Sequence, residues 1–217
     1  MALRWRPWLL LSSLAVLSAG ILWFFSTVAL DRPAASSGPR AGDEGQGEAI
    51  AQAQPLVTFI DPVRGNPEGS VLIVEYGDYV CPFCRTVESG VVRLLAAHPE
   101  VKFVWKDLPH SAHPGADIAA EAAHCAKSQG KFWTYHKRLL EEPGFFNETS
   151  LALIASDLGL DAQAFTRCLT SREMRPIVER SVSEAVALGI DATPYFFIKG
   201  KRYSGQLSYE TLEAAVR

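Results

Sequence analysis

The sequence predicts an α/β domain that carries a helical insertion and follows an apolar N-terminal segment. Strand-like apolar runs stand on both sides of one helical stretch, a block of helical periodicity follows, and two strand-like runs with a final helix close the chain. Such alternation indicates an α/β core, and the uninterrupted helical block indicates an insertion into it. The formal net charge is −3 and no basic run is present, which argues against nucleic acid as a partner.

The N-terminal segment is long and apolar enough to cross a membrane. Residues 8–30 contain no charged residue, and about 20 apolar residues suffice for one spanning helix. Arg4 and Arg6 precede this stretch, and the positive-inside rule places them in the cytoplasm. We expect residues 1–30 to be a cytoplasmic tip and a transmembrane signal-anchor, with the rest of the chain in the periplasm or an equivalent space. A cleaved signal peptide ending near Thr27–Ala29 is the alternative, and it also exports the domain.

A polar linker is expected between this anchor and the folded domain. Residues 31–55 are rich in Ala, Gly, Pro, Ser, Gln and acidic residues and contain no aromatic residue. Such a segment buries too little apolar surface to offset the entropy lost on ordering. We expect a flexible tether with a root-mean-square reach of about 25–30 Å. Residues 56–217 then form one globular domain.

The strands and helices of this domain are expected in the following order. Residues 55–60 and 70–76 are predicted strands, the second apolar enough to be buried on both faces. A helix begins at the cysteines, because Pro82 suits a first helical position, and it runs to His98–Pro99. The remaining elements are a strand at 101–108, an insertion of about 111–189 with helices at 116–129, 132–140, 150–159 (capped by Ser150), 161–169 and 176–189, strands at 194–200 and 201–206, and a helix at 209–217.

Cys81 and Cys84 form a C-x-x-C pair at the expected start of the first helix, and three interpretations compete. A structural disulfide there would close almost no loop and so would stabilise little. A zinc site usually takes four ligands, and the chain has no second such pair, although histidines elsewhere could supply nitrogen. A redox centre explains more, because a helix N-terminus favours the thiolate of an exposed Cys81 while Cys84, one turn further on, is shielded.

The two other cysteines, Cys125 and Cys168, lie on separate predicted helices. Outside the cytoplasm an even number of cysteines suggests pairing. A bond that closes a loop of about forty residues is worth about 4 kcal/mol in the chain-entropy model. We therefore predict a structural Cys125–Cys168 disulfide, and the alternative is two unpaired buried thiols that act as small apolar residues.

Two segments together resemble a known family. "DPVRGNPEGSVLIVEYGDYVCPFC" from Asp61 and "LGIDATPYFFIKG" from Leu188 are similar to the DsbA-like thiol:disulfide oxidoreductases of the thioredoxin superfamily. The resemblance runs from about Phe59 to the C-terminus and includes the helical insertion. It implies a thioredoxin-like fold in which the bond between Thr193 and Pro194 is cis and Pro194 lies against a redox-active Cys81–Cys84 disulfide.

The resemblance also gives Glu75 a role, because the family places a buried acid beneath the disulfide. A buried carboxylate has a raised pKa, so Glu75 could relay a proton to or from Cys84. The alternative is that Glu75 faces solvent at the end of its strand. Lys106, in "KFVWKDLP", is a candidate partner for the Glu75 carboxylate.

The function implied by the resemblance is that of a protein disulfide oxidoreductase without a cofactor. Its partners would be exported cysteine-containing polypeptides and a re-oxidising or reducing protein in the membrane, and we expect a monomer. The compartment favours disulfide donation, but Phe83 replaces the histidine of the most oxidising members, so CPFC leaves the direction open. The alternatives are a disulfide isomerase or reductase of the same fold and a copper- or zinc-handling module.

Overall fold

The computed structural model describes residues 52–142 and 144–217. The predicted transmembrane segment and all but the last four residues of the predicted linker lie outside these ranges. No helix in the described ranges is long and apolar enough to span a bilayer.

Five strands form one mixed sheet in the order β1-β3-β2-β4-β5. The central strands β2 and β3 run parallel, and the three other neighbouring pairs are antiparallel. Both central strands are buried along most of their length, as expected for strands that are covered on both faces, although β3 also carries charged side chains. The strands are β1 Val63–Gly65, β2 Val71–Gly77, β3 Val101–Asp107, β4 Tyr195–Ile198 and β5 Lys201–Ser204.

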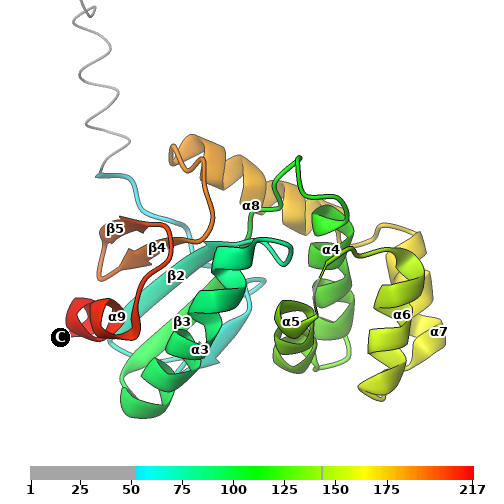
Figure 1. Cartoon of the computed structure of the whole chain (residues 1–217), viewed down its shortest axis with the longest axis horizontal. Helices are drawn as coiled ribbons and strands as arrows, with labels where there is room; N and C mark the ends of the chain where they lie inside the picture. The colour runs from blue at the N-terminus through cyan, green and yellow to red at the C-terminus, as the bar shows by residue number, and fades with distance from the viewer. Residues whose placement is uncertain (1–51, 143) are drawn as a thin grey trace, which may run out of the picture. The chain divides into compact units, whose positions relative to one another are not determined.

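Helices cover both faces of this sheet, which confirms the predicted α/β core with a helical insertion. The helices are α3 Pro82–Ala97, α4 Ala116–Lys127, α5 Phe132–Glu141, α6 Glu148–Asp157, α7 Ala162–Thr170, α8 Arg175–Ala187 and α9 Tyr209–Val216. α3, α9 and most of the insertion pack on the face that carries Ile73 and Phe103, whereas the end of α8 packs on the face that carries Val74 and Val104. Figure 1 shows α4 to α7 gathered on the side of the sheet away from β5 and α9.

The first predicted strand is wrong in position. Residues 55–60 form no strand, and β1 lies further on at Val63–Gly65, antiparallel to β3. The backbone N–H and the hydroxyl of Thr58 donate to Asp61 Oδ2 at 2.6 and 3.0 Å, which closes a local turn in place of a strand ladder. Phe59, one of the apolar residues behind the strand prediction, is 95% exposed.

The parallel register of β2 and β3 decides which side chains share a face. Glu75 lies opposite Trp105, and Lys106 points to the other face because successive residues of a strand alternate. On that face its Nζ lies 2.8 Å from Glu184 Oε2 and 3.2 Å from Asp61 Oδ1. We call these three residues the Lys106 ion cluster. The interpretation that Lys106 pairs with Glu75 is therefore wrong.

The N-terminus of α6 also differs from the prediction. Asn147, not Ser150, is the cap: its side chain accepts from the Ser150 N–H at 3.0 Å. The Ser150 hydroxyl accepts in turn from the Asn147 N–H at 3.1 Å, which completes a reciprocal capping box. The helix consequently begins at Glu148, two residues before the predicted start at residue 150.

A disulfide joins α4 to α7 inside the insertion. It links Cys125 and Cys168, which are 43 residues apart in sequence and both buried. A bond that closes so long a loop stabilises the fold mainly by restricting the unfolded chain. The disulfide thus ties two helices of the insertion together, whereas the thiols of Cys81 and Cys84 are free in this structure.

Candidate active site

The loop from β2 to α3 positions the dithiol. Asp78 organises this loop: its carboxylate accepts from the Val80 N–H at 2.8 Å, and its carbonyl accepts from the Cys81 N–H at 3.1 Å. Cys81 is the N-cap of α3, and Pro82 occupies the first turn, where its missing N–H costs no hydrogen bond. The Cys81 sulfur is thereby placed at the positive end of the helix dipole.

Cys81 is buried, contrary to the expectation that its sulfur is exposed. Cys81 retains 3% and Cys84 1% of their surface. The Cys81 thiol donates to the Thr193 carbonyl oxygen at 3.3 Å, and the Thr193–Pro194 peptide bond is cis. The segment before β4 therefore lies against the sulfur, while the Phe83 ring, between the two cysteines, is 54% exposed.

The two thiols have opposite acidities. A hydrogen bond from Cys84 is the largest influence on Cys81. With help from the Thr193 side chain and from the backbone N–H groups of Phe83 and Cys84, it overcomes burial and lowers the Cys81 pKa to about 5. Burial, with the same hydrogen bond and the charge of Glu75, raises the pKa of Cys84 far above its ordinary value. The reduced pair thus holds its negative charge on Cys81 and its proton on Cys84.

Glu75 lies in the core with 1% of its surface exposed, so the alternative that it faces solvent is wrong. Neither carboxylate oxygen has a hydrogen-bond partner within the described part of the chain. Burial, followed by the charges of Glu88 and Cys81, raises the pKa of Glu75 well above its ordinary value. A carboxyl group in this state holds a proton that it can exchange with a neighbouring thiol.

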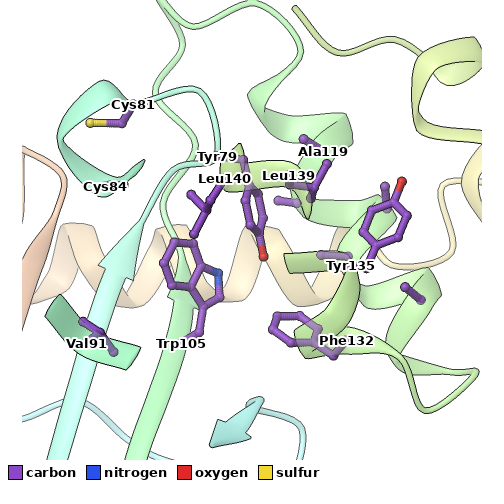
Figure 2. Packing of buried hydrophobic residues seen from close by; sticks show 14 of the residues in the cluster. Tyr79, Cys81, Cys84, Val91, Trp105, Ala119, Phe132, Tyr135, Leu139 and Leu140 are labelled. Carbon is purple, nitrogen blue, oxygen red and sulfur yellow. The ribbon is translucent and has the colours of Figure 1, made fainter. Parts of the chain in front are cut away.

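A second acid network, which the sequence analysis missed, lies on the same face as Glu75. Glu88, one turn after Cys84 on α3, pairs with Arg64 at 3.0 Å and has its Oε2 3.7 Å from His136 Nε2. The other ring nitrogen of His136 lies 3.0 Å from the Tyr79 hydroxyl. Figure 2 shows the rings of Tyr79 and Trp105 side by side in this core, with Cys81 at the first turn of α3. His136 and Arg64 lower the pKa of Glu88 despite its burial, so Glu88 stays charged and disfavours ionisation of Glu75.

Asp78 is a further site residue that the sequence analysis did not single out. Its buried carboxylate accepts from the His110 N–H at 2.9 Å and pairs with His113 Nδ1 at 2.6 Å. Its own N–H donates to Cys84 Sγ at 3.4 Å. Asp78 therefore ties the loop between β3 and α4 to the dithiol. The available signal was an acid three residues before the first cysteine, a position suited to a local turn.

The alternative that Cys81 and Cys84 bind a metal ion depends on whether the described residues offer further ligands. Within residues 52–142 and 144–217, no group of three or more His, Cys, Asp or Glu side chains could hold a metal ion. A zinc site with four protein ligands on the dithiol would need donors from outside these ranges.

Comparisons with known proteins agree with this geometry. Residues 58–217 match the family described as Thioredoxin. The chain is similar to a thioredoxin-like oxidoreductase from Silicibacter pomeroyi DSS-3, with 36% identity over 73% of this chain and 91% of that one and a TM-score of 0.68. It shares its fold with the thiol-disulfide exchange protein alpha-DsbA2 from Wolbachia pipientis, at 22% identity over 82% and 98% of the two chains and a TM-score of 0.71. The chain also shares its fold with BdbD from Bacillus subtilis, at 21% identity over 76% of this chain and 95% of that one, with a TM-score of 0.69.

Curated relatives include much longer proteins. The Na(+)/H(+) antiporter NhaA 1 of Salinispora arenicola is 39% identical over 166 residues, which is 74% of this chain and 26% of that protein. The chain thus spans about a quarter of that relative's length, and the antiporter name describes the larger protein. The family match, the 36% identical oxidoreductase and the dithiol geometry agree with one another. The chain belongs to the thioredoxin family and shares its fold with DsbA-like proteins.

Proposed function

We propose that this protein is a membrane-anchored, extracytoplasmic oxidoreductase that donates disulfides to exported polypeptides through Cys81 and Cys84. The observation that carries the proposal is the unequal acidity of the two thiols. A thiolate that is stabilised at neutral pH favours the reduced form of the enzyme, which makes its disulfide a stronger oxidant. At pH 7, a Cys81 pKa of about 5 instead of an ordinary value stabilises the dithiol by about 1–3 kcal/mol, or roughly 20–60 mV.

The reaction would proceed by two exchanges. A substrate thiolate attacks Cys81 of the oxidised enzyme, the Cys81–Cys84 bond breaks, and Cys84 takes up a proton as it leaves. A second substrate thiolate then attacks the substrate sulfur of the mixed disulfide and expels the Cys81 thiolate. The substrate loses two electrons and two protons in total, and the enzyme leaves as a dithiol.

Glu75 and the segment at Thr193–Pro194 have separate roles in this proposal. Glu75 delivers the proton to Cys84, supported by its raised pKa and its lack of other hydrogen-bond partners among the described residues. The backbone at Thr193, which touches the Cys81 sulfur, offers a carbonyl edge along which an extended substrate can align. Pro194, directly after it, limits the directions from which a substrate can approach Cys81.

The surroundings of the domain follow from the N-terminal sequence. Residues 1–30 would hold the chain in the membrane and residues 31–55 would let the domain, residues 56–217, explore the surface as a monomer. Turnover needs a membrane protein that accepts the two electrons of the dithiol. The name alpha-DsbA2, a thiol-disulfide exchange protein, fits this assignment.

Reductase or isomerase activity is the second candidate, and Phe83 is the observation that favours it. The half-exposed ring has no hydrogen bond to give to the Cys81 thiolate. A redox titration of the full-length protein against glutathione decides between the two directions, with Cys81→Ser as the control that abolishes the signal. Donation predicts a potential well above that of thioredoxin, about −270 mV. A value close to that of thioredoxin would refute donation.

A further inference from the structure

A pocket opens next to Thr193, the residue whose carbonyl oxygen contacts Cys81, and α8 of the helical insertion forms part of its wall. Its volume is about 290 Å³, and three segments that are far apart in sequence form its walls. These are the loop after β3, α8, and the segment that leads to β4. The lining residues are Leu108, Pro109, His110, Ser111, Val182, Ile190, Asp191, Ala192 and Thr193.

The lining suits an apolar side chain. Five of the lining residues are aliphatic or proline, and neither lysine nor arginine is among them. The volume lies at the lower end of the range of about 300–1,000 Å³ that is typical of small-molecule sites, so the pocket has room for one large side chain or two small ones. The polar side chains of the lining belong to Thr193 and to three residues that are exposed to solvent, His110, Ser111 and Asp191.

Three hydrogen bonds connect the walls of the pocket to the sulfur atoms. Thr193 lines the pocket, and its carbonyl oxygen lies 3.3 Å from Cys81 Sγ. On the opposite wall, the His110 N–H donates to the Asp78 carboxylate at 2.9 Å, and the Asp78 N–H donates to Cys84 Sγ at 3.4 Å. A substrate polypeptide that is bonded to Cys81 therefore lies next to this pocket, because these hydrogen bonds fix the position of the pocket relative to the two cysteines.

We propose that this pocket is a specificity subsite that binds an apolar side chain next to the reacting cysteine of the substrate polypeptide. The inference depends on the proposed function and names the substrate feature that the enzyme selects. An extended chain advances about 3.3 Å per residue, so a residue one or two positions from the cysteine reaches the pocket. Burial of that side chain holds the cysteine in place for attack on Cys81.

The substrate chain has room to continue past the pocket. A second hollow of about 610 Å³ shares Pro109 and Val182 with the first and extends along α8. Its charged side chains pair with one another: Arg172 with Asp117 and Glu121, and Arg175 with Glu179. Because the charges of both signs are already paired, we expect the apolar pocket and not this hollow to decide which substrates react fast.

The test uses the full-length oxidised protein and short peptides that each carry one cysteine. Two peptides differ only in having leucine or lysine next to the cysteine, first on one side and then on the other, and glutathione serves as a reference thiol. The rate of mixed-disulfide formation is measured by acid quenching and mass spectrometry. We expect the leucine peptide to react about tenfold faster than the lysine peptide on one of the two sides.

Variants of α8 and of the loop after β3 assign this preference to the pocket. Val182→Arg places a charged side chain in the lining and should abolish the preference for leucine. Val186→Arg is the matched control, because Val186 lies one turn further along the same helix, is 70% exposed and lines neither hollow. If Val182→Arg does not fold, Ser111→Trp fills the pocket from an exposed loop position and should have the same effect.

The possible results separate the two proposals. No reaction with either peptide or with glutathione would contradict the proposed function itself. Equal rates for the two peptides on both sides of the cysteine would overturn the subsite and leave disulfide exchange intact. Loss of the preference in Val186→Arg as well as in Val182→Arg would overturn it too, because a general effect of charge on α8 would then explain the selectivity.

Discussion

The acidity of Cys81 depends on a donor that can be removed with one substitution. A hydrogen bond from Cys84 is the largest of the influences that lower the Cys81 pKa to about 5. Cys84→Ala removes this donor, whereas Cys84→Ser replaces it with a hydroxyl group on the same carbon. Both variants leave Cys81 as the only free thiol within the described ranges, because Cys125 and Cys168 are bonded to each other.

The expected difference between these variants follows from the strength of one bond. A hydrogen bond to a charged group is worth about 1.5–3 kcal/mol, and one pKa unit corresponds to about 1.4 kcal/mol. Cys84→Ala should therefore raise the pKa of Cys81 by about one to two units. Cys84→Ser should keep it close to the wild-type value. The helix N-terminus and the backbone N–H groups remain in both variants, so neither should reach the value of a free thiol, about 8.5.

The assay is the rate of alkylation as a function of pH, because only the thiolate reacts. With a pKa of about 5, the rate rises roughly tenfold between about pH 4 and pH 7 and is then flat. An ordinary thiol would gain roughly a thousandfold over the same interval. Circular dichroism at each pH controls for unfolding. Identical titrations of the alanine and serine variants would refute the assignment of the shift to Cys84, and a serine variant that titrates near about 8.5 would refute the role of the helix terminus as well.

Four further predictions concern stability. The reduced protein should gain stability relative to the oxidised protein as pH rises, because the pKa of Cys81 in the folded state is lowered from 9.0 to about 5. Scanning calorimetry of both forms should show that this gain disappears as pH falls through about 5. Glu75→Gln should slow peptide oxidation but raise the melting temperature, and this stabilisation relative to the wild type should grow with pH, because the folded wild type binds an extra proton at Glu75; a difference from the wild type that shrinks as pH rises would contradict this. Replacing both Cys125 and Cys168 with alanine should cost about 4 kcal/mol in urea denaturation, given the 43-residue separation, with the alkylation profile of Cys81 unchanged. Lys106→Met should cost about 3–5 kcal/mol because it leaves the two carboxylates of the Lys106 ion cluster without their buried cation, and a loss below about 1 kcal/mol would show that the cluster is solvated.

Local patterns in the sequence were sufficient for most of the fold. The run from Val71 to Gly77 is apolar enough to define a central strand, and Pro82 marks the first turn of the following helix. The apolar spacing of the insertion gave five helices, and all five are present in α4 to α8. These features depend on neighbours within a few residues, which is the range over which hydrophobic periodicity and capping act.

Two of the errors concern contacts between residues that are far apart in the chain. The face to which Lys106 points depends on its register with β2, and no pattern within "KFVWKDLP" contains that information. The burial of Cys81 depends on Thr193, which is 112 residues away. The first strand was predicted in the wrong place because a turn between Thr58 and Asp61 takes up hydrogen bonds that a strand would make with its neighbour.

The burial of Cys81 changes how its reactivity must arise. Removal from water disfavours a thiolate, so an N-terminal helix position would not by itself produce a pKa of about 5 at a cysteine residue with 3% of its surface exposed. The shift requires donors that are already directed at the sulfur, and Cys84 is the largest of them. Cys84 can fill that role only while it keeps its proton, which burial and its hydrogen bond with Cys81 enforce. Because the pKa of Glu75 is also raised, Glu75, Cys81 and Cys84 are parts of one coupled proton system. A substitution at any of the three should therefore alter the titration of the other two.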